Sequence, residues 1–168
     1  MKDYYNVLFI CTENAARSQM AEALLNHIGR GRFKAYSAGS QPSGQIHPMA
    51  LAALAHAQID AHGLYSKNWH EFTKPTAPEM DLVFTLCDRA AGEVCPAWPG
   101  IPTLAHWNIE HPGLTGDAEA QQHSFNHTLA ILRHRLDLLI ALPFEKLDQL
   151  ALKQHLTDIG LSPRKETL

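Results

Sequence analysis

The chain has 168 residues, of which 45% are hydrophobic and 18% charged, and its formal net charge is −3. These values are typical of a globular chain long enough to bury a full core, so we expect residues 1–168 to form a single domain. The slightly acidic balance does not favour binding of nucleic acid, and no apolar run is long enough to predict a membrane span. The first residues lack the apolar stretch of a signal peptide, so we expect a cytoplasmic protein, in which cysteines are usually reduced, metal-bound or catalytic.

Apolar runs typical of buried strands alternate with helical patterns along the chain. Apolar side chains recur at spacings of four and three residues from Phe125 to Leu139, which predicts one long helix with an apolar stripe in the core. The predicted order is a strand at 6–10, a helix at 18–28, a strand at 33–37, a helix at 48–58, a buried strand at 82–86, an edge strand at 101–105, the long helix, and a terminal helix at 147–159. This alternation predicts an α/β fold, a four-stranded parallel sheet with helices on both faces.

The segment between the first strand and the first helix carries the strongest chemical pattern. A helix N-terminus offers N–H groups and partial positive charge, which bind oxyanions and stabilise a thiolate. The planar fork of Arg17 matches two oxygens of a tetrahedral anion. We therefore expect Cys11 to be a nucleophile with a pKa below the value of about 8.5 for a free cysteine. The oxyanion-binding loop would consist of Thr12, Glu13, Asn14, Ala15, Ala16 and Arg17.

Alternatives to this interpretation remain for each residue of the loop. Cys11 could be a small buried hydrophobic residue and Arg17 an ordinary surface cation. Ser18 could act only as a helix N-cap, or its hydroxyl could donate to the thiolate as part of the site. Glu13 is unusual in an anion-binding loop, because a carboxylate repels the substrate, and we expect its side chain to point away from the anion.

Two further cysteines, Cys87 and Cys95, raise the total to three. An odd number argues against a static disulfide framework. Cys87 ends a predicted strand, as Cys11 does, so both thiols should lie at the carboxyl edge of the sheet, where such folds bind ligands. Alternatively, Cys87 could be a core thiol at a strand end and Cys95 an idle loop thiol. A zinc site with His106 would lack a close-spaced ligand pair, so we expect no metal.

At this point the sequence resembles a known family. Cys-x5-Arg-Ser directly after the first strand is similar to the phosphate-binding loop of the low-molecular-weight protein tyrosine phosphatases and of their thiol-dependent arsenate reductase relatives. The resemblance spans about residues 5–112. Segments similar to the reductase branch are Gln19-Met20-Ala21-Glu22-Ala23-Leu24, Tyr36-Ser37-Ala38-Gly39, Cys87-Asp88, Glu93-Val94-Cys95-Pro96, Trp98-Pro99-Gly100 and His106-Trp107.

The resemblance implies reduction of arsenate to arsenite by a cysteine relay, serving arsenic detoxification. Cys11 would attack arsenate, Cys87 would attack the Cys11 sulfur as arsenite leaves, and Cys95 would then take over the disulfide. No bound cofactor is implied. The external reductant would be thioredoxin or glutathione with glutaredoxin, and phosphate and sulfate would bind as analogues of arsenate. We expect a monomer.

One departure from the family concerns the general acid. Relatives commonly carry an Asp-Pro pair at the end of the loop after the last strand, where the Asp is the general acid, whereas here the matching pair is His111-Pro112, preceded by Glu110. His111 could donate a proton, since its reference pKa is about 6.5, Glu110 could replace it, or neither residue acts.

This departure bears on the choice between activities. In a phosphatase, the aryl alkoxide needs a proton as it leaves. A reductase that works by thiol displacement depends less on a general acid. The departure therefore weakens the phosphatase interpretation more than the reductase interpretation. The alternatives are a phosphatase acting on phosphotyrosine or small phosphate esters, and an inactive oxyanion-binding or redox-sensing relative.

Overall fold

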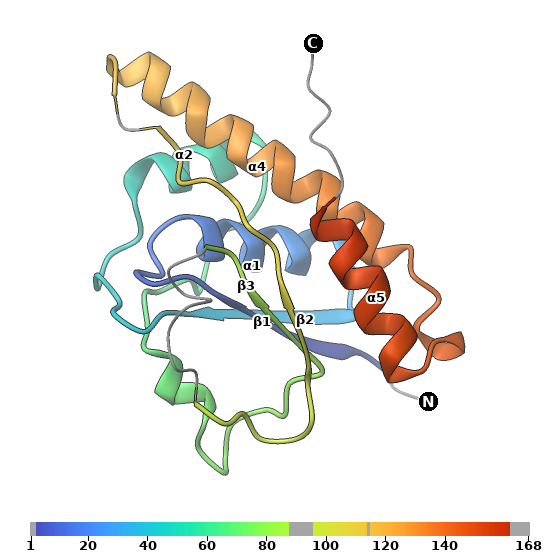
Figure 1. Cartoon of the computed structure of the whole chain (residues 1–168). Coiled ribbons are helices and arrows are strands. Elements are labelled where there is room, and N and C mark those ends of the chain that lie inside the picture. The colour runs from blue at the N-terminus through green and yellow to red at the C-terminus, as the bar shows by residue number, and fades with distance from the viewer. Residues whose placement is uncertain (1–2, 88–95, 114, 162–168) are drawn as a thin grey trace.

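The chain folds around a four-stranded parallel sheet (Figure 1). The computed structural model describes residues 3–87, 96–113 and 115–161. The strands are β1 (Tyr5–Ile10), β2 (Phe33–Ala38), β3 (Leu82–Thr85) and β4 (Thr103–His106), in the spatial order β2-β1-β3-β4. Each neighbouring pair is parallel. Because β1 is hydrogen-bonded on both sides, the loop that begins at Cys11 leaves from the rigid centre of the sheet.

The predicted elements are present, and their ends shift by only a few residues. The α-helices are α1 (Arg17–Ile28), α2 (Pro48–His56), α4 (Ala118–Ile140) and α5 (Gln149–Gly160), and two short 3-10 helices are η1 (Trp69–Phe72) and η2 (Phe144–Lys146). Helix α2 ends earlier than expected because Gln58 has a positive φ of 62°, which a right-handed helix cannot continue.

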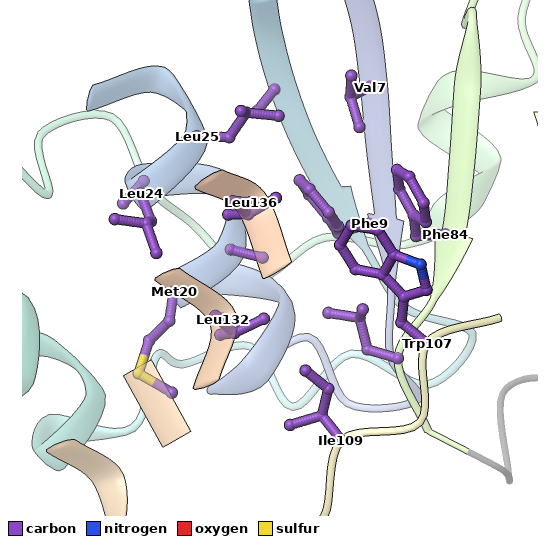
Figure 2. Close-up of a cluster of buried hydrophobic side chains, with 14 of the residues drawn as sticks. Val7, Phe9, Met20, Leu24, Leu25, Phe84, Trp107, Ile109, Leu132 and Leu136 are labelled. Carbon is purple, nitrogen blue, oxygen red and sulfur yellow. The ribbon is translucent and has the colours of Figure 1, made fainter. Parts of the chain in front are cut away.

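The main core lies between the sheet and the helices α1 and α4 (Figure 2). Val7, Phe9 and Phe84 alternate along β1 and β3 toward this face, which is the period of a strand. Helix α1 contributes Met20, Leu24 and Leu25, and α4 contributes Phe125, Leu129, Leu132, Leu136 and Leu139. The expected apolar stripe of the long helix is thereby confirmed as core.

Helix α5 is held against the sheet edge by one buried tryptophan. The indole Nε1–H of Trp107, directly after β4, donates to the carbonyl of Leu156 at 2.8 Å. A Cβ at Gly160 would come within 2.6 Å of the Trp107 ring. Glycine therefore belongs to the last turn of α5 because it allows this close approach.

The opposite face of the sheet is covered differently. Leu8 and Ile10 pack there with Trp69 and Phe72 of η1 and with Trp98. The cover supplied by the described residues is thus a 3-10 helix and irregular chain, in keeping with the prolines at 75 and 78, which do not fit inside an α-helix. Both faces carry helical cover, and the predicted α/β architecture is confirmed. Over the three described ranges, no helix is both long and apolar enough to cross a bilayer.

Candidate active site

The loop from Cys11 to Arg17 crosses the carboxyl end of β1 and leads into α1. The Cys11 N–H continues the sheet pairing by donating to the carbonyl of Ala38 at 3.2 Å. Next to Ala38, a Cβ at Gly39 would overlap with the carbonyl oxygens of Cys11 and Thr12. Only glycine lets the end of β2 lie this close to the loop, so Gly39 is needed for the loop to take this shape.

The loop carbonyls are held on its outer side by the chain that follows β2. The carbonyls of Thr12, Glu13 and Ala15 accept hydrogen bonds from the N–H groups of Gln41, Ser43 and His47, at 2.9, 3.0 and 2.8 Å respectively. In a planar trans peptide the N–H points opposite to the C=O. Each of these carbonyls shares its peptide with the N–H of the following residue. That N–H therefore points toward the inner side of the loop, and the three N–H groups together form a nest of donors for an anion.

Asn14 ties this nest to its surroundings. It is fully buried with a φ of 48°, a left-handed conformation that asparagine tolerates better than most residues. Its side-chain amide donates to Ser18 at 2.8 Å, and its oxygen accepts from Gln19 at 2.8 Å and from the Lys67 N–H at 2.9 Å. The loop is thereby joined to the first turn of α1 and to a segment more than fifty residues further on.

A buried ion pair lies behind that segment. The Lys67 ammonium is 3.6 Å from the Glu22 carboxylate, and the two side chains are only 5% and 13% exposed. Lys67 also donates to the Tyr65 carbonyl at 2.7 Å, and the Ser37 hydroxyl donates to Glu22 at 2.6 Å. Burial raises the pKa of Glu22 and lowers that of Lys67, and the attraction between the two charges opposes both shifts. The pair holds residue 67 where its backbone can reach Asn14.

Arg17 and Ser18 occupy the first turn of α1. The Arg17 guanidinium donates to the carbonyl of Ile109 at 2.8 Å, so the chain after β4 orients it. Ser18 is fully buried, and the N-cap residue is Ala16, which has no side-chain cap. The interpretation of Ser18 as an N-cap is therefore wrong. A bond from its hydroxyl to the thiolate stays a prediction.

The two described thiols meet at this edge of the sheet. Cys11 Sγ lies 3.4 Å from Cys87 Sγ, and the Thr12 hydroxyl lies 3.8 Å from the same Cys87 sulfur. Both cysteines are buried, and the distance between their sulfurs exceeds the S–S bond length of about 2.05 Å, so no disulfide joins these two residues. Cys11 thus has a second sulfur as its immediate neighbour. Cys95 lies outside the described residues.

The hydrogen bond between the two sulfurs affects the pKa of Cys11. The hydrogen bond from Cys11 to Cys87 is the largest cause that raises the pKa of the Cys11 thiol, and burial raises it further. The charge of Arg17 and the Thr12 N–H act in the opposite direction. The expected pKa below that of a free cysteine is wrong for this arrangement. The sequence could not reveal a hydrogen bond between thiols 76 positions apart.

Removal of the second thiol should therefore activate the first. In a Cys95→Ser background, Cys87→Ala should move the midpoint of Cys11 alkylation to lower pH, because the largest cause of the raised pKa is lost. The midpoint is measured from iodoacetamide rates against pH, with the modified peptide identified by mass spectrometry. A midpoint that rises instead would mean that Cys87 donates its proton to a Cys11 thiolate.

The loop and the thiols line a hollow of about 460 Å³. Its lining residues are Cys11, Thr12, Glu13, Asn14, Ala15, Ala16, Arg17, His47, Cys87 and His111. Glu13 is exposed, in keeping with the expectation that its carboxylate avoids the anion. The sequence analysis missed His47. Its position before Pro48 marks a helix start, but nothing in the sequence indicates that this start borders the loop.

Of the two candidates for the general acid, His111 lines the hollow. Its ring nitrogen Nδ1 is 2.7 Å from the Pro112 carbonyl. Because a carbonyl can only accept, Nδ1 carries the proton, and Nε2 is the basic nitrogen of the neutral ring. His111 can thus take up a proton at Nε2 and return it as an imidazolium. Glu110 is exposed.

No group of three potential metal ligands occurs in the described parts of the chain. His106 has Nδ1 2.8 Å from the Thr85 hydroxyl. The alternative of a zinc site with Cys87 and Cys95 depends on a residue outside those parts.

Comparison with known proteins identifies the family. Residues 6–153 match the model of the low molecular weight phosphotyrosine protein phosphatases. The chain belongs to this family. Among curated members, it is 32% identical over 106 residues to the glutaredoxin arsenate reductase of Synechocystis, covering 63% of this chain and 77% of that protein.

Solved structures of arsenate reductases are also similar to this chain. The chain resembles an arsenate reductase in the phosphate-binding state, with a TM-score of 0.65, 28% identity, and coverage of 82% of this chain and 97% of that one. A thioredoxin-dependent arsenate reductase from Corynebacterium glutamicum matches with a TM-score of 0.55 and 27% identity, over 82% of this chain and 64% of that one. The suspected relation to arsenate reductases of this fold is thereby confirmed.

Proposed function

We propose that this protein reduces arsenate to arsenite in arsenic detoxification. The observation that carries the proposal is the 3.4 Å separation between Cys11 and Cys87 beside the anion-binding loop. Hydrolysis of a phosphate ester needs only one nucleophilic thiol, and reduction needs a second sulfur to remove it from arsenic. The named reductases among the relatives support the same choice.

In the first step, the Cys11 thiolate attacks arsenic, and one As–O bond breaks. The loop amides and Arg17 hold the remaining oxygens and stabilise their charge. The departing oxygen takes up protons and leaves as water, with His111 as the candidate acid. Arsenic stays in the +5 state as a thiolate adduct of Cys11.

In the second step, the Cys87 thiolate attacks the Cys11 sulfur. An S–S bond forms, the S–As bond breaks, and its electron pair stays on arsenic, which becomes arsenic(III) and leaves as arsenite. The two thiols lose two electrons, and arsenate gains them. The two sulfurs start only 3.4 Å apart, so little movement is needed to form this bond.

The enzyme must then be reset. Cys95 attacks Cys87 by thiol–disulfide exchange, which frees Cys11 and leaves a Cys87–Cys95 disulfide. Thioredoxin or glutaredoxin with glutathione reduces this disulfide, in keeping with a cytoplasmic location. No bound cofactor takes part in this scheme, and each monomer carries the whole relay.

Turnover with defined reductants tests the function. Purified protein should oxidise NADPH in the presence of arsenate when coupled to thioredoxin with its reductase, or to glutathione, glutaredoxin and glutathione reductase. An aryl-phosphate assay on the same protein measures phosphatase activity. Absence of arsenate-dependent oxidation with both systems, together with rapid aryl-phosphate hydrolysis, would favour the phosphatase instead.

A further inference from the structure

His47 is the part of the hollow that the proposed relay does not use. It is half-buried, and it is held at three points relative to the loop. Its backbone N–H donates to the loop carbonyl of Ala15 at 2.8 Å. Its ring packs against the fully buried Phe125, with centroids 4.5 Å apart and the ring planes tilted by 33°. Its Nδ1 accepts from the Met49 N–H at 3.1 Å and so caps α2. The imidazole is therefore pre-oriented beside the anion-binding loop.

The cap also decides which ring nitrogen carries the proton. Nδ1 accepts a hydrogen bond, so the neutral imidazole has its proton on Nε2. His111 has the opposite arrangement, since its Nδ1 lies against a carbonyl and its Nε2 is basic. The two histidines of the hollow thus differ in chemistry: His47 can donate at Nε2 while uncharged, and His111 can accept there.

We propose that His47 contacts the substrate and donates its Nε2–H to an oxygen of the bound tetrahedral oxyanion. This inference rests on the proposed function for the identity of the substrate, and it applies equally to inorganic phosphate as an analogue. The donor adds to the loop amides and Arg17 without the desolvation cost of another buried charge.

Two substitutions separate this role from the helix cap. Asn carries a side-chain oxygen at the position of Nδ1 and is a good N-cap, but its amide does not reach the position of Nε2. Gln places an amide nitrogen near Nε2 and is a poor cap. His47→Asn therefore keeps the cap and loses the donor, and His47→Gln does the reverse. His56→Asn, on the exposed end of the same helix, is the matched control.

Isothermal titration with inorganic phosphate and thermal unfolding are measured on all four proteins. His47→Asn should bind phosphate about tenfold more weakly, the loss expected for one hydrogen bond to a charged ligand. Both variants lose the ring contact with Phe125, so His47→Asn, which keeps the cap, should melt at a higher temperature than His47→Gln. His47→Gln should bind within about threefold of wild type and melt at a lower temperature. The KM for arsenate should follow the phosphate affinities, and His56→Asn should match wild type.

If His47→Asn binds phosphate as tightly as wild type, the proposed contact is wrong and His47 acts only as a helix cap. If no variant folds, nitrogen NMR of the wild-type protein decides, because the Nε2 resonance of His47 should shift on saturation with phosphate and would stay in place without a contact. A protein that shows the predicted phosphate affinities but reduces no arsenate would overturn the proposed function and leave the contact of His47 standing.

Discussion

Cys11→Ser is expected to abolish arsenate reduction and any hydrolysis of aryl phosphates, each by at least about a thousandfold. The serine hydroxyl is a poor nucleophile at neutral pH, and it cannot form the disulfide that carries electrons to arsenic. The anion site itself should survive, because the donors come from loop amides and Arg17. Activity with both substrates and phosphate affinity are the measurements.

The size of this effect separates Cys11 from a merely buried thiol. The side chain is 5% exposed, so the alternative that it is only part of the core is a real one. A core role predicts a lower melting temperature with activity largely kept. Ala23→Ser, at an equally buried position of α1 that does not line the hollow, is the matched control for a new hydroxyl. Retained turnover in Cys11→Ser would exclude the nucleophile assignment.

Cys87→Ser is expected to reduce arsenate turnover to background, at least about a hundredfold, and to leave aryl-phosphate hydrolysis within about threefold of wild type. Cys11 can still form its adducts, and water can still hydrolyse a phosphate adduct. No neighbouring sulfur remains to break the S–As bond. Rates with both substrates are measured on the same preparation, so that loss of one activity alone cannot come from misfolding.

Cys95→Ser is the comparison that places each thiol in the relay. It should release about one arsenite per protein and then stop with a Cys11–Cys87 disulfide, because the second exchange is blocked. Arsenite release in a rapid-quench experiment and the disulfide found by mass spectrometry measure this. Wild-type turnover by both variants would mean that an external thiol attacks the Cys11 adduct directly, and the relay would be wrong.

Much of the scaffold could be predicted because it depends on local pattern. The strand before Cys11 and the long stripe from Phe125 to Leu139 follow from the periods of strand and helix. The shared edge of Cys11 and Cys87 follows from the ends of parallel strands. The two wrong predictions, the lowered pKa of Cys11 and the N-cap role of Ser18, depend on contacts with neighbouring residues. Ser18 was a plausible cap by composition alone, but the helix starts earlier, and Asn14 uses the Ser18 hydroxyl as an acceptor.

The sequence by itself therefore determined the alternating elements, the thiol loop between the first strand and helix, and the edge where Cys11 and Cys87 gather. Only the tertiary structure decided which contacts the residues at that edge make. The hydrogen bond between the two thiols, the buried pair of Lys67 and Glu22, and the place of His47 beside the loop all join residues far apart in sequence. Their effects depend on burial and on distances of a few ångströms, because electrostatic and hydrogen-bond energies vary steeply with both. Residue spacing along the chain does not encode either quantity.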